Sequence, residues 1–172
     1  VALTRKYNFS KQTGKPAITL VAFIDFECPY TRESFPTLKQ LAKDYDGVIK
    51  IVFKHFPISN INPNALKAAL ASQCAGDQGK FWDYADRLFT DKKLSTDDLY
   101  NTANSLGLNM TQWQKCLSEE KHQDNIQNDM QDGVDIDVRG TPTFILEDKK
   151  IEGALDKSLW DLAIINALNA KQ

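Results

Sequence analysis

The chain has 172 residues, of which 42% are hydrophobic and 26% charged, and this is enough for one domain with an apolar core. Its net charge of −2 and its pI of about 5.7 exclude a broad surface for nucleic acid or another polyanion. No apolar run reaches the ~20 residues of a membrane span. The chain begins at Val1 without a signal peptide, so we expect a mature or trimmed form.

The first elements lead to a cysteine. Residues 1–16 are polar and predict a short strand and a loop, and the apolar run 18–26 predicts a buried strand. After it, apolar residues recur at helical spacing from Phe35. Cys28 therefore lies where a strand gives way to a helix, and Pro29 suits the first helical position because its missing N–H costs nothing there.

The position of Cys28 predicts a nucleophile. The free N–H groups and the positive dipole at a helix start point at the sulfur and favour the thiolate, which is the reactive form. The alternative is an inert, buried cysteine that acts as a small hydrophobe. We favour the reactive thiol because strand, Cys28, Pro29 and amphipathic helix occur together in this order.

The middle of the chain changes character. A second buried strand is predicted at 48–56, and residues 62–132 then carry only helical patterns, which begin near residues 62, 81, 95 and 111. The last pattern continues through Ile126 and Met130 as a polar stretch that we expect to be mostly solvated.

Strands return after Gly133. Residues 143–146 predict a strand, 150–152 its partner across a turn, and a closing amphipathic helix carries Leu159, Trp160, Ala163, Ile164, Ala167 and Leu168. This order predicts an α/β class, with residues 1–61 and 133–172 as the core and 62–132 as a helical insertion.

Four segments together resemble the DsbA-like thiol–disulfide oxidoreductases of the thioredoxin superfamily. They are Asp-Phe-Glu-Cys-Pro-Tyr at 25–30, His-Phe-Pro at 55–57, Cys-Ala-Gly-Asp-Gln-Gly-Lys-Phe-Trp at 74–82 and Gly-Thr-Pro-Thr-Phe at 140–144. Each is weak alone, but the four in this order are specific and span nearly the whole chain. The resemblance implies a thioredoxin-like fold with an inserted helical domain.

The resemblance also implies a substrate site. Thr141-Pro142 resembles the cis-proline loop of the family, which lies beside the reactive sulfur, where the Thr141 backbone pairs with a bound peptide as an added strand. Pro29 and Tyr30 would contact the same substrate. The alternative for Pro142 is a simple proline at the entry of a strand.

The chain departs from this family at Thr31. The family carries Cys-x-x-Cys, whereas this chain carries Cys28-Pro29-Tyr30-Thr31. Thiol–disulfide exchange needs an attacking thiolate and a way to resolve the mixed disulfide. The Thr31 hydroxyl can reach the Cys28 sulfur as a hydrogen-bond donor, but it cannot form a disulfide. We therefore expect mixed disulfides only.

Two explanations for Thr31 are open. It is either an introduced substitution that disables or traps a two-cysteine enzyme, or the natural residue of a monothiol relative. We favour the first because the rest of the chain matches a dithiol oxidoreductase so well.

Other polar groups near Cys28 carry weaker signals. Asp25 and Glu27 precede it, and a carboxylate there can relay protons or tune the thiol. The sequence supports a catalytic role for these two carboxylates and the absence of such a role equally. His55 is expected to be a hydrogen-bonded framework residue and His122 to be exposed. No close ligand spacing predicts a metal site, and no cofactor is expected.

The three cysteines suggest one bridge and one free thiol in an exported protein. If Cys28 is the reactive thiol, Cys74 and Cys116 are left to pair; the alternative is two buried free thiols. A bridge of this kind fits an oxidising compartment.

The resemblance implies a periplasmic or otherwise extracytoplasmic monomer. It would act on reduced or unfolded exported proteins and be reoxidised by a membrane redox partner of the DsbB type, a cycle that Thr31 is expected to break. The alternatives are a monothiol enzyme that uses glutathione and a redox-inactive module that binds peptides as a chaperone does.

Overall fold

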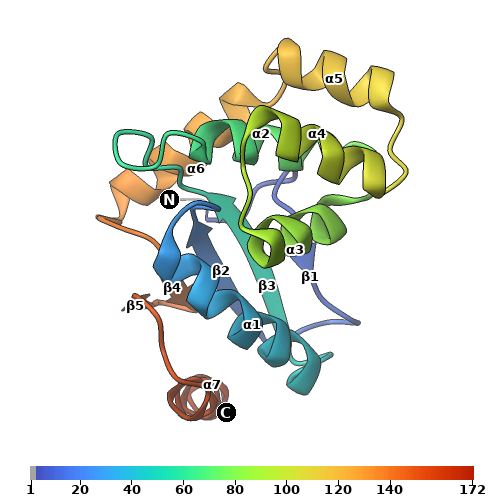
Figure 1. The fold of residues 1–172 in the computed structure, drawn as a ribbon. Coiled ribbons are helices and arrows are strands. Elements are labelled where there is room, and N and C mark those ends of the chain that lie inside the picture. Colours follow the sequence, from blue (N-terminus) through green and yellow to red (C-terminus); the bar gives the residue numbers. More distant parts are fainter. Residues whose placement is uncertain (1–2) are drawn as a thin grey trace.

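A computed structural model describes residues 3–172 and contains one mixed sheet with helices on both faces (Figure 1). The strand order is β1-β3-β2-β4-β5, in which β2 and β3 are parallel and the other neighbours are antiparallel. The strands are β1 (Ser10–Lys11), β2 (Ile18–Ile24), β3 (Ile49–His55), β4 (Thr143–Leu146) and β5 (Lys149–Glu152).

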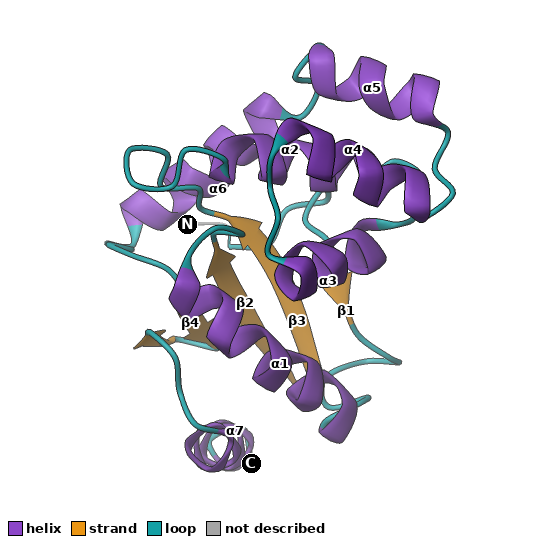
Figure 2. Ribbon diagram, viewed as in Figure 1, coloured by secondary structure: helices purple, strands orange, loops and turns teal. Residues whose placement is uncertain are grey.

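The helices occupy most of the remaining chain (Figure 2). They are α1 (Pro29–Asp44), α2 (Ala65–Gly76), α3 (Phe81–Asp91), α4 (Thr96–Ser105), α5 (Met110–Ser118), α6 (Gln123–Asp135) and α7 (Lys157–Asn169). None of the helices within residues 3–172 is both long and apolar enough to cross a bilayer. The mixed α/β class predicted from the sequence is confirmed.

Successive side chains along β2 point to opposite faces of the sheet, and each face packs against a different apolar cluster. Leu20, Ala22 and Ile24 face the larger cluster, to which α1, α3 and α7 contribute buried side chains. Val21 and Phe23 face the smaller one, which α6 covers with Met130. The strand that the sequence predicts to be buried is therefore covered on both faces.

The helix α6 lies close against the sheet because it has a glycine at the contact. A Cβ atom on Gly133 would come within 2.7 Å of the Phe56 ring and 3.1 Å of the Phe23 ring. The predicted boundary between insertion and core, at residue 133, falls inside this helix.

The prediction that the stretch through Ile126 and Met130 continues the previous helix and is mostly solvated is wrong. The chain leaves α5 at Ser118 and turns at Glu120, whose φ is +48°, before α6 begins at Gln123. Ile126, Asp129 and Asp132 are buried.

Smaller departures affect helix ends and faces. The first helix after β3 begins at Ala65 rather than near residue 62, and α5 begins at Met110 with Asn109 as its side-chain cap. Leu159, predicted on the apolar face of the closing helix, is exposed, whereas Trp160 and Ile164 are buried as that pattern predicts.

Candidate functional site

Cys28 lies at the junction of β2 and α1, as the sequence predicts. It is the N-cap residue of α1, with extended backbone angles of φ −67° and ψ 124°, and Pro29 occupies the first turn. No side chain in the described part of the chain caps this helix end, so the first N–H groups of α1 remain available to a negative charge at the sulfur. Within residues 3–172, Cys28 is the free cysteine, and its exposed fraction is 8%.

The loop before β4 lies directly beside this sulfur. Thr143 is in register with Phe23 near the end of β2, so the preceding residues reach the start of α1. The Thr141–Pro142 peptide bond is cis, and the Cys28 thiol donates a hydrogen bond to the Thr141 carbonyl oxygen at 3.2 Å. The residues that the resemblance assigns to thiol chemistry and peptide binding therefore meet at one place.

Tyr30 and Thr31 differ sharply in exposure. The Tyr30 side chain is exposed next to the sulfur, whereas Thr31 is fully buried with 0% exposure. Within residues 3–172, the Thr31 hydroxyl has no hydrogen-bond partner, so the hydrogen bond to the Cys28 sulfur anticipated from the sequence is not formed.

The carboxylates of Asp25 and Glu27 serve the backbone around the site. Asp25 is buried and accepts hydrogen bonds from the Glu27 N–H at 2.8 Å, the Ile58 N–H at 2.9 Å and the Asn62 amide at 2.8 Å. Glu27 accepts from the Asn64 N–H at 2.7 Å and from its side-chain amide at 2.9 Å. Both acids thus fix the segment that joins β3 to α2 next to Cys28, and their effect on the thiol stays a prediction.

His55 is a buried framework residue. Its Nε2 lies 3.0 Å from the Gln73 amide nitrogen, which donates to it, and its Nδ1 has no partner among the residues that the structure describes. The ring packs against Phe26, Phe53 and Phe81. Burial lowers the pKa of His55 to about 3, and the charge of nearby Lys54 acts in the same direction. The imidazole is therefore neutral at physiological pH.

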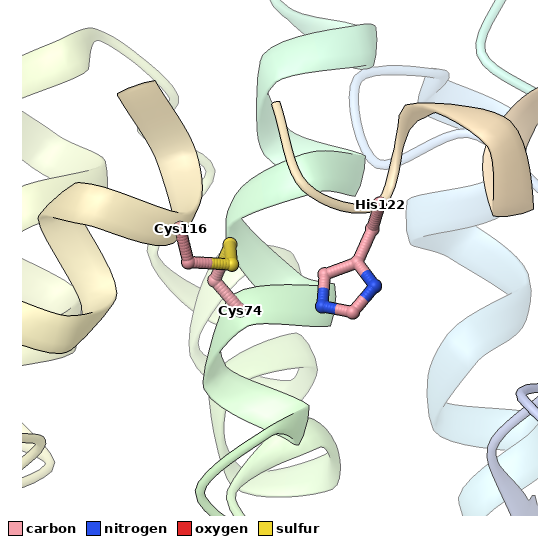
Figure 3. A group of neighbouring side chains, drawn as sticks. All are labelled: Cys74, Cys116 and His122. Atoms are coloured by element: carbon pink, nitrogen blue, oxygen red, sulfur yellow. A yellow bond between two sulfur atoms is a disulfide. The ribbon is translucent and has the colours of Figure 1, made fainter. Parts of the chain in front are cut away.

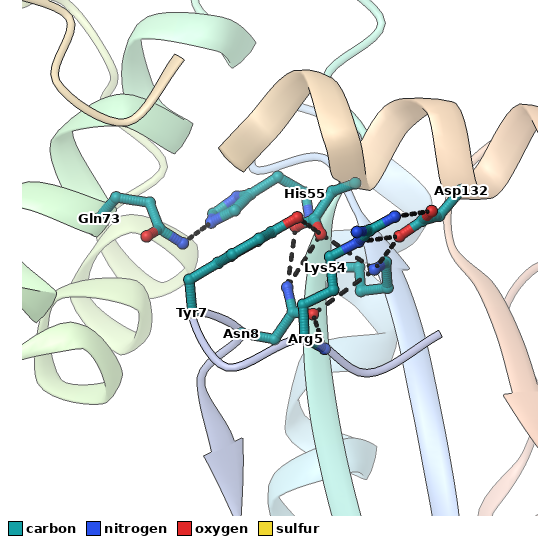
Figure 4. Close-up of polar contacts among 8 residues, drawn as sticks. Arg5, Tyr7, Asn8, Lys54, His55, Gln73 and Asp132 are labelled. Atoms are coloured by element: carbon teal, nitrogen blue, oxygen red, sulfur yellow. Dashed lines mark hydrogen bonds and ion pairs between the residues drawn. The ribbon is translucent and has the colours of Figure 1, made fainter. Parts of the chain in front are cut away.

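An ion-pair network beneath His55 joins three distant parts of the chain (Figure 4). Lys54, fully buried in β3, lies 3.0 Å from Asp129 and 2.8 Å from Asp132, both on α6. Arg5 makes two further hydrogen bonds to Asp132, at 2.5 and 2.8 Å.

The network also holds the backbone of β3. The His55 N–H donates to Asp129 at 2.9 Å, and Tyr7 and Asn8 donate to the same carboxylate. Hydrogen bonding by Arg5 lowers the pKa of Asp132, whereas burial raises the pKa of Asp129. Sequence reasoning missed this network, for which Lys54, one of two lysines in the predicted strand, is the one local signal.

Cys74 and Cys116 are joined by a disulfide that links α2 to α5, with Cα atoms 5.8 Å apart. The expectation that His122 is exposed is wrong, because its side chain is only 12% exposed and its Nε2 lies 2.9 Å from Asp77. Asp77, at the end of α2, and Asn125, in the first turn of α6, both contact the ring.

Curated proteins with sequences similar to this chain are much longer than it is. The chain is 33% identical over 152 residues to the Na(+)/H(+) antiporter NhaA 1 of Salinispora arenicola, which covers 87% of this chain and 23% of that protein. It is 31% identical over 163 residues to NhaA 1 of Mycolicibacterium gilvum, covering 91% and 26%. The chain thus spans about a quarter of the length of these curated relatives.

Two solved structures superpose on nearly the whole chain. A thioredoxin-like oxidoreductase from Silicibacter pomeroyi has a TM-score of 0.83 at 24% identity, covering 96% of this chain and 94% of that one. BdbD from Bacillus subtilis has a TM-score of 0.85 at 21% identity, covering 95% and 94%. The family described as Thioredoxin matches residues 14–166. The fold is therefore thioredoxin-like, as predicted, and the chain belongs to this thioredoxin family.

Proposed function

We propose that the chain is a thiol–disulfide oxidoreductase of DsbA type that reacts through Cys28. The observation that carries the proposal is the position of the Cys28 sulfur, at an uncapped helix start and 3.2 Å from the backbone oxygen of Thr141. The helix end stabilises a thiolate, and the neighbouring loop offers backbone groups to a peptide. The thiol–disulfide exchange protein α-DsbA2 of Wolbachia pipientis, with a TM-score of 0.83 at 22% identity, supports the same chemistry.

The reaction ends at a mixed disulfide. The Cys28 thiolate attacks one sulfur of a substrate disulfide, a new S–S bond forms, the old one breaks, and the departing sulfur leaves as a thiolate that takes up a proton. A second cysteine one helical turn later would release the substrate, but Thr31 holds that position. Release therefore requires attack by a thiol from outside the chain. The protein traps substrates rather than cycling between dithiol and disulfide.

The substrates we propose are unfolded exported proteins that carry an accessible disulfide, in a periplasmic or other extracytoplasmic compartment. The Cys74–Cys116 bridge fits an oxidising compartment, and a solved periplasmic thioredoxin-like protein from Salmonella enterica, with a TM-score of 0.76 at 22% identity, supports it. Tyr30, Pro29 and the Thr141–Pro142 loop would contact the substrate. A membrane partner of the DsbB type would find no active-site dithiol to oxidise.

Mixing the protein with glutathione disulfide at neutral pH tests this proposal. Mass spectrometry is expected to show one glutathione added per chain, at a rate well above that of a cysteine in an unstructured peptide. Cys28→Ser is the control and is expected to add none. A rate no higher than that of the peptide would contradict the proposal and favour a redox-inactive module that binds peptides.

The same experiment separates the monothiol alternative. An enzyme that uses glutathione would release the adduct in the presence of reduced glutathione and turn over repeatedly, whereas a trap would exchange slowly. The match to the NhaA antiporters covers about a quarter of their length, so it supports no antiport activity for this chain.

A further inference from the structure

Four potential metal ligands gather where the end of α2, the helix α5 and the start of α6 meet. The end of α2 supplies Cys74, α5 supplies Cys116, and His122 precedes α6 (Figure 3). The sulfur atoms and a ring nitrogen of these three residues all lie within 4.8 Å of one another. Asp77 adds a carboxylate whose Oδ2 is 2.9 Å from His122 Nε2 and 3.7 Å from Cys116 Sγ.

Two thiolates, an imidazole and a carboxylate form a complete ligand set for a tetrahedral Zn²⁺ ion. Such an ion needs sulfur at ~2.3 Å, nitrogen at ~2.0–2.1 Å and oxygen at ~2.0–2.2 Å. We propose that reduction of the Cys74–Cys116 disulfide turns this cluster into a site for one Zn²⁺ ion, held by Cys74, Cys116, His122 and Asp77. The site is separate from the thiol chemistry of Cys28 and does not depend on it.

The site exists only in the reduced chain. A dithiol reductant supplies two electrons and two protons, so the Cys74–Cys116 bond breaks, two thiols form and the reductant becomes a disulfide. The metal ion then displaces both thiol protons as it binds. In the oxidised chain each sulfur is bonded to the other and carries no negative charge, so two of the four ligands are missing.

The surroundings of the cluster allow a metal ion to enter. A surface cavity of about 450 Å³ is lined by Cys74, Asp77, Cys116 and Lys121, among others. Asn125 lies 3.2 Å from His122 Nδ1 and orients the ring so that Nε2 faces Asp77. Metal binding moves the ring proton to Nδ1, where the oxygen of the Asn125 side chain can accept it after the amide rotates.

Lys121 occupies the metal position on Asp77 in the oxidised chain. Its Nζ lies 2.8 Å from Asp77 Oδ2, and its side chain is 56% exposed. A cation on a flexible, exposed side chain can leave for solvent at low cost. Lys121 therefore competes with the metal ion without blocking it. Replacing this lysine is expected to tighten metal binding, an effect that a purely structural cluster would not show.

Cobalt(II) binding to a Cys28→Ser chain tests the site, because this background removes the third thiol. The protein is reduced with a phosphine, which takes up oxygen from water, and is then titrated with Co²⁺. One Co²⁺ per chain is expected, with thiolate-to-cobalt charge-transfer absorption and the visible bands of a tetrahedral site, and Zn²⁺ is expected to displace it. The unreduced protein is expected to show neither signal.

Variants in the same background assign the ligands. Asp77→Asn and His122→Ala are expected to weaken Co²⁺ binding by at least about tenfold, and Lys121→Gln is expected to tighten it. Asp83→Asn is the matched control because Asp83 also pairs with a lysine, 3.1 Å away, but lies outside the cluster. Replacing both Cys74 and Cys116 by Ser is expected to abolish the charge-transfer absorption.

Circular dichroism keeps the test decisive. If the reduced chain keeps its helical signal but binds no Co²⁺ with thiolate absorption, the proposal is overturned. If reduction unfolds the helical block, Zn²⁺ is expected to restore the signal, and failure to do so also overturns it. Equal Co²⁺ spectra before and after reduction would also overturn the proposal.

Discussion

Cys28 and Thr141 lie 113 positions apart in the sequence, yet the sulfur of the first is 3.2 Å from the carbonyl oxygen of the second. The contact exists because β4 runs antiparallel to β2 and places its preceding loop at the end from which α1 departs. A nucleophile and a backbone edge for peptide binding are thus combined by sheet topology.

Thr31→Cys is expected to create a disulfide with Cys28 and a gain of oxidase activity. Residues 28 and 31 are three positions apart across the first turn of α1, a spacing that brings side chains to one face. The variant is expected to catalyse disulfide formation in a reduced, unfolded protein, which refolding of that protein would report. Thr31→Val is the matched control, and oxidase activity no higher than that of the control would favour the monothiol or peptide-binding alternatives.

Thr31→Val is itself expected to stabilise the fold. The Thr31 hydroxyl is buried without a partner, and a buried, unpaired polar group costs ~1–3 kcal/mol. Urea denaturation is expected to show a free energy of unfolding higher by about 1 kcal/mol. Thr37→Val in the same helix is the control, because Thr37 is only partly buried. Destabilisation by Thr31→Val would mean that the hydroxyl is satisfied in solution.

Lys54→Met is expected to lower the free energy of unfolding by about 3–5 kcal/mol, because it leaves the buried carboxylates of Asp129 and Asp132 without their shared cation. Lys39→Met is the matched control. Lys39 also forms an ion pair, with Asp86, but its side chain is 54% exposed, so a loss of at most ~1 kcal/mol is expected. Equal losses in the two variants would contradict the role assigned to the network.

His55 is expected to make stability depend on pH. Its pKa is about 3 in the folded chain and 6.5 in the reference state, so between these values the unfolded chain binds a proton that the folded chain does not. Stability therefore falls as the pH drops from about 6.5 towards 3, by up to ~1.4 kcal/mol per pH unit. Guanidinium denaturation of His55→Phe between pH 4 and 7 is expected to show a shallower slope, and an unchanged slope would argue against a neutral, buried His55.

The features that the sequence predicts well are local ones. The apolar run through Phe23 predicts β2, and the helical spacing of Phe35 and Leu38 predicts α1. The end of β2 and the start of α1 are a few residues apart, and Cys28 falls between them. The site residues near position 28 follow from this junction. No local pattern locates the loop of Thr141, and only the family resemblance predicts that it lies beside the sulfur.

The features that the sequence does not predict depend on distant partners. Asp129 and Asp132 look like the exposed face of a polar helix until Lys54, from a strand far earlier in the chain, is placed against them. His122 looks exposed for the same reason, because Asp77 covers it from another helix end. No periodicity records such pairings, since each member is ordinary in its own segment.

In mechanical terms, the Cys74–Cys116 bridge makes part of the chain inextensible. A pulling force applied at the two ends of the chain crosses from Cys74 to Cys116 through the bond, and the residues between them carry no load. Their separation of 42 positions corresponds to roughly 140–150 Å of extended backbone. A single stretched molecule therefore lengthens by about that amount when a reductant cuts the bridge, apart from the 5.8 Å that the bridge already spans.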